Sequence, residues 1–369
     1  MEAVSAPMVS GFSIASAASP ARPGADRAIA GWLILCAAMI LLMVIIGGIT
    51  RLTESGLSIT EWRPIEGVLP PLTLAQWHDA FIHYQAIPQF HAIHAGMSLE
   101  QFKGIFFWEY LHRLWGRLIG IVFLLPFLYF LARRQIVRGL WPKLALIFVL
   151  GALQGLLGWY MVESGLAHRI EVSQYRLAAH LFAAIVIYGA ILWVAFDLLW
   201  PVPAPVTTRD VGGRGLRRAL DLILLLVAVT LIAGAFVAGL RGGSIYNTFP
   251  LMGDHFMPGE YAAMAPLWRN WFENPASAQF DHRVLAETTW LAIMLIWGFG
   301  RGRVAGPRRR ALDLVAAMAT LQVGLGIATL LTVVALPLGV AHQAGAVLLI
   351  TATLYARHRF RRTAPVVSS

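Results

Sequence analysis

Residues 29–49 read IAGWLILCAAMILLMVIIGGI, an apolar run without a single charged side chain. A helix needs about 20 such residues to cross a bilayer, because every backbone polar group must be hydrogen-bonded within the segment. This stretch is therefore predicted to be a transmembrane helix, and it gives the pattern to look for in the rest of the chain.

Similar apolar runs recur along the 369-residue chain, which is 58% hydrophobic and only 13% charged. Counting the first, eight candidate spans lie at residues 29–49, 110–131, 141–162, 175–199, 219–240, 283–300, 311–332 and 337–356. None of the first seven alternates with a period of two, as the strands of a membrane barrel would. The predicted fold class is an all-α polytopic membrane protein with eight transmembrane helices.

The net charge of +10 is concentrated in particular segments between the spans. Basic residues cluster at 133–143, 209–218, 301–310 and 357–362, whereas the long loops 51–108 and 241–281 hold most of the loop acids. The positive-inside rule then predicts that both termini are cytoplasmic. The basic balance is interpreted as membrane topology, and no nucleic-acid partner is expected.

The predicted domains follow from these segments. Residues 1–28, rich in Ser, Ala, Pro and Gly, are predicted to be a disordered cytoplasmic tail and not a signal peptide. After the tail we expect an N-terminal four-helix bundle at 29–200 with the long outer loop 51–108, a cytoplasmic linker at 201–218, a C-terminal four-helix bundle at 219–356 and a basic cytoplasmic tail at 357–369.

Short motifs repeat between the two halves of the chain. The repeated pairs are Glu109–Arg113 with Gln279–Arg283, Leu153–Gly158 with Leu321–Gly326, and Arg176–His180 with Gly339–Gln343. A duplicated unit with an even number of spans gives a parallel repeat about an axis along the membrane normal. The expected architecture is two tandem, pseudo-symmetric four-helix bundles.

Four of the 11 histidines occupy matching places in this repeat, in the first turn or so of spans two, four, six and eight. They are His112 and His180 in the first half and His282 and His342 in the second. Two imidazoles at the same depth can ligate one haem iron, so each half is predicted to hold a bis-histidine haem near the outer leaflet. The alternative, that each histidine only hydrogen-bonds a neighbour, would suit a single histidine better than four in register.

Glu109 lies three residues before His112, on the same helical face, whereas the matching position in the second half is Gln279. A haem that reacts needs a nearby acid or base and a haem that only passes electrons does not, so Glu109 is a candidate catalytic residue. The alternative is an ordinary acid at a helix entry. Arg113 and Arg283 are candidate partners of the haem propionates, or interfacial residues that snorkel.

Other histidines carry weaker signals. His91 and His94 form a His-x-x-His pair in the first outer loop, but further ligands at metal-binding spacing are missing there, and we expect solvated loop histidines whose role stays open. The single cysteine, Cys36, excludes an intrachain disulfide and a thiolate-ligated cluster.

Several long motifs resemble those of the haem A synthases, and the resemblance extends from about Trp32 to about Tyr355. The motifs are Gly47–Trp62, Gly67–Leu72, Glu109–Arg113, Gln154–Trp159, Tyr175–His180, Gly234–Leu240 and Tyr246–Gly253. The outer-loop cysteine pairs of some members are missing, so the chain is similar to the proteobacterial and mitochondrial branch, with its origin between the two left open. Arg241 and Gly242 replace an acidic or small pair found in many members, which leaves the role of that loop position undecided.

The resemblance implies a function that the residue pattern alone does not. It implies that the first half binds the substrate haem O at His112 and His180 with Glu109 essential, and that the second half holds haem b at His282 and His342. It also implies two successive hydroxylations of one ring methyl, which yield the formyl group of haem A, in a bacterial or mitochondrial inner membrane with the haems toward the outer, periplasmic side.

The implied partners are a haem O synthase, cytochrome oxidase assembly factors and membrane lipid, with a homo-oligomer left open. From the residues alone, a diheme cytochrome b subunit that oxidises quinol, or a haem transporter without chemistry, remain alternatives. Two permanently bound haems b would favour the cytochrome, and haem binding without any new haem species would favour the transporter.

Overall fold

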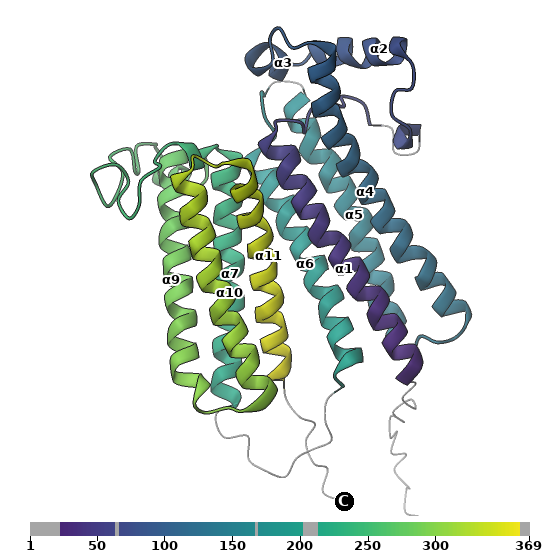
Figure 1. Ribbon diagram of the computed structural model, residues 1–369, viewed down its shortest axis with the longest axis vertical. Coiled ribbons are helices and arrows are strands. Elements are labelled where there is room, and N and C mark those ends of the chain that lie inside the picture. Colours follow the sequence, from purple (N-terminus) through teal and green to yellow (C-terminus); the bar gives the residue numbers. More distant parts are fainter. Residues whose placement is uncertain (1–22, 63–65, 167–168, 202–212, 362–369) are drawn as a thin grey trace, which may run out of the picture.

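A computed structural model describes residues 23–62, 66–166, 169–201 and 213–361. Within these ranges the regular structure is helical, apart from one isolated β-bridge between Met252 and His255. Eight of the described helices have 24 residues or more: α1 (Pro23–Leu52), α4 (Leu99–Ala132), α5 (Trp141–Leu166), α6 (Gln174–Leu199), α7 (Gly213–Gly239), α9 (Pro275–Arg301), α10 (Gly306–Leu331) and α11 (Leu336–Arg359). Figure 1 shows these helices lying roughly side by side.

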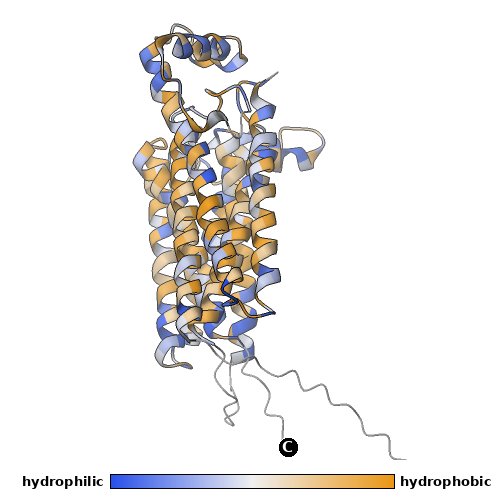
Figure 2. Cartoon of the chain, turned by 90° about the vertical axis from the view of Figure 1, so that its right-hand side faces the viewer, coloured by the Kyte–Doolittle hydropathy of each residue, from blue (hydrophilic) through white to orange (hydrophobic). Residues whose placement is uncertain are grey.

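Seven of the eight long helices are long and apolar enough to cross a membrane, which confirms an all-helical, multi-pass membrane protein. The remaining one is α9, whose hydropathy is lowered by Asp281, Arg283 and Glu287. Figure 2 shows apolar residues over the middle of the helices and hydrophilic residues toward both ends. A bilayer has an apolar hydrocarbon core between two polar surfaces, and the distribution of residues along the helices matches this arrangement.

The long helices form two groups of four, which are separate in Figure 1. In the first group α1 contacts α4, α4 contacts α5, α5 contacts α6 and α6 contacts α1. In the second group α7, α9, α10 and α11 contact one another in the same cyclic order. Each group is therefore a closed four-helix arrangement whose interior can hold side chains from all four members.

The two groups meet where α1 and α6 face α7 and α11. The interface is mainly apolar, but polar contacts also cross it, two of them between the middle parts of the long helices. Tyr188 on α6 shares a hydrogen bond of 2.7 Å with Thr351 on α11, and the Gln343 amide donates to the Val44 carbonyl at 3.3 Å. These contacts fix the first group against the second at two depths.

Several predicted boundaries are corrected by the structure, among them the start of the sixth span, which is Pro275 instead of residue 283. The second span begins at Leu99 instead of residue 110, because Ser98 and Gln101 form a capping box that starts the helix. Residues 23–28, predicted as part of the disordered tail, belong to α1, and residues 213–218, predicted as linker, belong to α7. The rest of the predicted tails and linker, at 1–22, 202–212 and 362–369, lies outside the described residues.

The long first outer loop is a folded cap. It contains η1 (Glu66–Val68), α2 (Leu74–Gln85) and α3 (Pro88–Ile93), which lie at one end of the first group in Figure 1. Phe81 and Tyr84 of α2 pack with Leu57 and with Phe102 and Phe106 of α4 in a buried apolar cluster. The first part of α4 thus extends beyond the bundle and carries this cap. The second outer loop holds η2 (Gly242–Ser244), η3 (Leu267–Arg269) and α8 (Asn270–Glu273).

Candidate functional site

The two second-half histidines face each other across the bundle. The ring centroids of His282 on α9 and His342 on α11 are 6.4 Å apart, with ring planes 86° to one another. An imidazole nitrogen lies about 2 Å from a metal ion that it ligates, so two rings on opposite sides of one ion have centroids roughly 6 Å apart. The separation of these two rings fits an iron held between them.

The four candidate histidines do not open their helices as expected. His112 lies about three and a half turns after Leu99, and the other three lie about two turns after the first residue of their helices. The expectation of a first-turn position was wrong because the helices begin earlier than their apolar runs. The histidines are still at the end of the bundles that carries the two long loops.

Each of the four histidine rings packs against a glycine of the preceding long helix. A Cβ added to that glycine would approach the ring Cε1 to 3.0 Å for Gly47 with His112, and to 2.9 Å for Gly158 with His180, Gly234 with His282 and Gly326 with His342. At these distances an added side chain would require the ring to shift. The glycines therefore form notches that admit an imidazole, and the same notch occurs four times.

Two glutamines hold the histidines of α6 and α11 in the same way. The Gln154 amide nitrogen lies 3.1 Å from Nδ1 of His180 and donates to the carbonyl of the same residue at 2.8 Å. The Gln322 amide nitrogen lies 3.1 Å from Nδ1 of His342 and 2.9 Å from its carbonyl. In this orientation the amide N–H donates to Nδ1. An imidazole that ligates iron through Nε2 carries its proton on Nδ1, so haem binding requires each amide to turn and present its oxygen, which has no partner among the described residues.

The histidines of α4 and α9 differ from each other. Nδ1 of His282 lies 3.0 Å from the backbone carbonyl of Thr230 on α7, to which it can donate its proton. Nδ1 of His112 is buried and has no hydrogen-bond partner among the described residues. The two halves are thus alike in their glycine notches and glutamines but unlike at this position.

Glu109 is buried, with a relative exposure of 3%, and both of its carboxylate oxygens are occupied. One oxygen accepts from the Ser58 hydroxyl at 2.8 Å and from the Ile59 amide at 2.7 Å. The other accepts from Arg113 at 3.1 Å and 2.6 Å. The carboxylate therefore ties the first outer loop to α4 one turn from His112.

Gln279, at the matching position of α9, makes fewer contacts. Its amide nitrogen donates to the Tyr246 carbonyl at 3.0 Å, while its buried oxygen has no partner among the described residues. The side chain touches the second outer loop as Glu109 touches the first, but it carries no charge. Glu109 and Gln279 therefore make equivalent contacts with their outer loops, and the two contacts differ in that only Glu109 is a carboxylate.

Arg113 and Arg283 also bind the outer loops. Arg113 donates to the carbonyls of Ile59 and Glu61 at 2.8 and 2.9 Å, and Arg283 donates to those of Tyr246 and Thr248 at 2.7 and 2.9 Å. Sequence reasoning did not foresee these loop contacts. The loop carbonyls hold both guanidinium groups at the ends of the bundles. Propionate binding by the two arginines stays a prediction.

His91 and His94 behave differently from each other. His91 is exposed, but His94 is not the solvated loop histidine expected. Its Nδ1 shares a hydrogen bond of 2.5 Å with the Tyr84 hydroxyl, and its Nε2 lies 3.6 Å from Glu54. Burial lowers the pKa of His94, while Glu54 acts in the opposite direction and Arg241 adds to the lowering.

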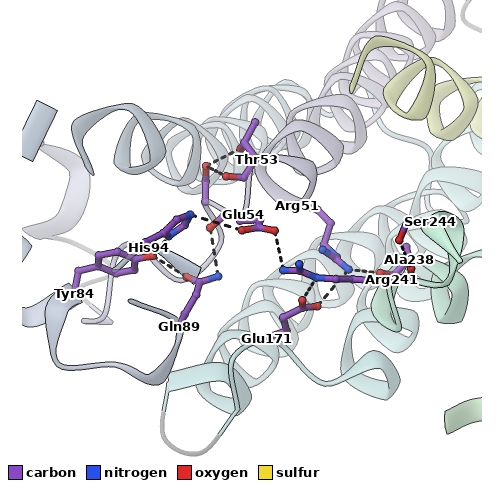
Figure 3. A network of polar contacts seen from close by, with 11 residues as sticks. Arg51, Thr53, Glu54, Tyr84, Gln89, His94, Glu171, Ala238, Arg241 and Ser244 are labelled. Carbon is purple, nitrogen blue, oxygen red and sulfur yellow. Dashed lines mark hydrogen bonds and ion pairs between the residues drawn. The ribbon is translucent and has the colours of Figure 1, made fainter. Parts of the chain in front are cut away.

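His94 and Glu54 belong to a polar network at the outer junction of the two groups, shown in Figure 3. Arg241, just after α7, lies 2.8 Å from Glu54 and forms a second ion pair with Glu171, which precedes α6. Arg51 at the end of α1 lies 3.5 Å from Glu171 and donates to the Ala238 carbonyl. One arginine of the second half is thus bound by two acids of the first half.

Comparison with known proteins agrees with this arrangement. The protein is 52% identical over 353 residues to a Heme A synthase of Rhodospirillum centenum, covering 95% of this chain and 93% of the relative. It is 49% identical over 338 residues to a Heme A synthase of Nitrosospira multiformis, covering 91% of this chain and 94% of that one. A Heme A synthase of Parvibaculum lavamentivorans is 48% identical, with 91% and 95% of the two chains covered.

The match also extends to a family profile. Residues 30–354 fit the cytochrome oxidase assembly protein family, a range that includes both groups of long helices and all four histidines with their glycine notches. The match thus covers the two bundles except for the first residues of α1 and the last residues of α11. The chain belongs to the family of cytochrome oxidase assembly proteins that contains the haem A synthases.

Proposed function

We propose that this protein is a haem A synthase, which oxidises haem O to haem A. Relatives that bear this name share about half of its residues over more than nine-tenths of its length. The reaction takes one ring methyl of haem O to a formyl group by two successive hydroxylations. The observation that carries the proposal is the pair of equivalent histidine sites, of which only the first has a buried carboxylate one helical turn away.

The first group of helices is proposed to bind haem O as substrate and the second to hold haem b. His112 and His180 would ligate the first iron, and His282 and His342 the second. The ring separation of the second pair and the four glycine notches support this assignment. Haem b, when bound, would supply a one-electron redox centre next to the substrate site.

The architecture proposed is eight transmembrane helices in two pseudo-symmetric bundles, with α9 counted among them. The matching cyclic contacts of the two groups and the matching glycine and glutamine contacts support the pseudo-symmetry. We place both termini in the cytoplasm of a cell with an inner membrane, and the histidines toward the periplasmic side, on the distribution of basic residues.

Glu109 is proposed as the catalytic carboxylate of the first site. It is held by Ser58, Ile59 and Arg113, so its position relative to His112 does not depend on side-chain rotation. From there it can accept a proton released at the reacting methyl group, or stabilise positive charge that develops on it. Gln279 can do neither, which fits a second site that only transfers electrons.

The proposed partners follow from the chemistry of the substrate. Haem O is too apolar to diffuse freely in water, so a haem O synthase in the same membrane is the natural donor. Cytochrome oxidase assembly factors would receive the product, and lipid surrounds the apolar helix faces. Arg113 and Arg283 are proposed to contact propionates from their places beside the loops.

Extraction of the haems from purified protein, followed by chromatographic separation, tests this function. Cells that also express a haem O synthase should yield haem b together with haem O, the hydroxylated intermediate and haem A. The diheme cytochrome alternative predicts two equivalents of haem b, and a transporter predicts no new haem species.

In His282→Ala or His342→Ala the low-spin haem b signal should disappear, because a lost axial imidazole has no replacement in an apolar bundle. A normal bis-histidine spectrum in both variants would contradict the assignment of the second pair.

A further inference from the structure

The contacts made by Nδ1 distinguish His112 from the other three candidate ligands. His282 faces the carbonyl of Thr230, an acceptor for its Nδ1 proton. The amides of Gln154 and Gln322 lie at Nδ1 of His180 and His342, and each can supply an acceptor there by turning its unpartnered oxygen toward the ring. Nδ1 of His112 is buried without any such partner among the described residues. Since all four rings sit in equivalent glycine notches, this difference does not come from a different placement of the ring.

The neighbours of the two unlike histidines also differ. The Thr230 hydroxyl is hydrogen-bonded to Leu226 O at 2.8 Å and to the Thr289 hydroxyl at 2.9 Å, which ties α7 to α9 beside His282. Gly47 and Gly234 occupy equivalent notches, so the first-half residue at the position of Thr230 is Met43, four residues before its glycine. By the same alignment of His112 with His282, Ile119 stands in place of Thr289.

Apolar side chains therefore replace the hydroxyl pair in the first half. Met43 packs instead toward Gly116 of α4, where an added Cβ would lie 3.3 Å from the Met43 Cε. Neither Met43 nor Ile119 can form the hydrogen bond that holds α7 to α9. The carbonyl of Met43 does not accept from Nδ1 of His112, which has no partner among the described residues.

A hydrogen bond at the second ring nitrogen fixes the orientation of a ligating histidine and makes it a stronger ligand. Losing such a partner typically lowers metal affinity by about 10- to 100-fold. A substrate haem has to enter and leave its site, whereas a resident haem does not. We propose, on the basis of the function proposed above, that His112 is the labile ligand of the first site, whose Nε2 leaves the iron first when haem A departs and binds it last when haem O enters, and that His180 is the firmer ligand of the pair.

The first site is labile because the residues around His112 give its Nδ1 no acceptor. The second site holds its haem permanently. During exchange the bond between the iron and Nε2 of His112 breaks first and the bond to His180 breaks afterwards, and both imidazoles stay neutral. No electron or proton transfer accompanies this step. The lability then depends on Met43 and Ile119, which touch neither the iron nor the reacting methyl group.

Carbon monoxide binding to the reduced, full-length protein measures this lability. Carbon monoxide binds a bis-histidine haem only after one histidine has left the iron, so the binding rate reports ligand release. In the wild type the first-half haem should bind carbon monoxide and haem b should not. The double variant Met43→Thr/Ile119→Thr introduces the hydroxyl pair, and we expect it to slow binding at the first site by about 10- to 100-fold.

The reverse substitutions in the second half and a packing control in the first half complete the experiment. Thr230→Met/Thr289→Ile should give haem b a measurable rate of carbon monoxide binding. Met43→Leu/Ile119→Leu changes packing at the same positions without adding hydroxyls, and it should keep the wild-type rate. Each variant is first checked for its content of both haems, so that a folding defect is recognised before the rates are compared.

Three results would overturn the inference. These are equal carbon monoxide binding by the two wild-type haems, an unchanged rate in the hydroxyl variant with normal haem content, or acceleration only in Gln154→Leu, which would make His180 the labile ligand. Failure of the proposed function is recognised separately, because extracted wild-type protein would then contain no haem O or haem A.

Discussion

Nη2 of Arg113 lies 2.6 Å from a carboxylate oxygen of Glu109, one helical turn earlier on α4, and both side chains also bind the segment Ser58–Glu61. The pair joins the first outer loop to the helix that carries His112. A carboxylate fixed in this way has a defined position beside the first site before any substrate binds. Such preorganisation is what a catalytic acid or base requires.

Replacement of Glu109 by glutamine should stop the oxidation without preventing haem binding. Glutamine keeps the size of the side chain, but it can neither take up a proton nor carry a negative charge. Loss of a general base typically lowers the rate by about 100- to 10,000-fold. The ratio of haem A, hydroxylated intermediate and haem O extracted from cells that express a haem O synthase measures the effect.

Gln279→Glu is the matched control for this prediction, because Gln279 holds the equivalent position in the second half. It should leave the haem ratio nearly unchanged. Wild-type formation of haem A by Glu109→Gln would mean that the carboxylate only anchors the loop.

Gly158→Ala should weaken the first site. The new methyl group would lie 2.9 Å from Cε1 of His180, closer than side chains normally approach, so the ring must shift away from the position that faces His112. We expect the affinity for haem in the first half to fall by about tenfold or more, which is typical when residues that orient a metal-ligating histidine are changed. Haem titration of the purified protein measures this change.

Gly155 offers the control for Gly158, since an added Cβ there meets no atom within 4 Å. Gly155→Ala should therefore bind haem normally and stabilise the helix by about 0.5–1 kcal/mol, because alanine has the higher helix propensity. In the second half Gly326→Ala and Gly324→Ala form the same kind of pair. Equal haem affinity in Gly158→Ala and Gly155→Ala would exclude the notch as a determinant of the site.

The sequence predicted the long helices well because their apolar runs are unbroken. It missed the start of α4 at Leu99, although the signal was present in the capping box of Ser98 and Gln101, because the hydropathy of that segment is low. Thr73 and Gln76 gave a similar signal for α2. These errors concern polar capping chemistry, which a search for apolar runs does not detect.

The residues of the candidate site could be identified from the sequence in part. The four histidines and Glu109 were identifiable from the repeat, and Gln154 and Gln322 stood in it without an assigned role. Their contact with Nδ1 depends on how α5 lies against α6 and α10 against α11, which spacing within one helix does not specify. The unlike neighbours of His112 and His282 also come from packing between helices.

Orientation in the membrane gives a separate prediction. Reporter fusions after residues 137 and 212 should be cytoplasmic, because basic residues surround both positions, and fusions near residues 75 and 260 should be external. Activity of paired cytoplasmic and periplasmic reporters at the four positions measures this. An inverted pattern would move the histidines to the cytoplasmic leaflet.

Arg241 is predicted to hold the two groups of helices together at their outer junction. It is 43% exposed and Glu54 is 27% exposed, so solvent screens their attraction. Arg241→Gln should therefore lower the free energy of unfolding by only about 1 kcal/mol, and the loss should shrink as salt is added. Arg241→Lys, which keeps the charge, should lose less. Thermal unfolding in detergent at low and high salt measures the difference.

The same substitution should change how stability depends on pH through His94. Burial holds the pKa of His94 below its ordinary value, and Arg241 adds to this lowering while Glu54 opposes it. The unfolded chain then binds a proton more readily, so this contribution to stability is present above a pH of about 6.5 and is lost as the pH falls below it. Arg241→Gln removes a positive neighbour and raises the pKa of His94, so acidification should destabilise the variant less than the wild type.

Unfolding temperatures of wild type and Arg241→Gln at about pH 8 and pH 5.5 test this prediction. The effect of Arg241→Gln is also measured in a His94→Asn background, where the difference should vanish. An equal loss of stability in wild type and Arg241→Gln would show that His94 does not respond to the charge of Arg241.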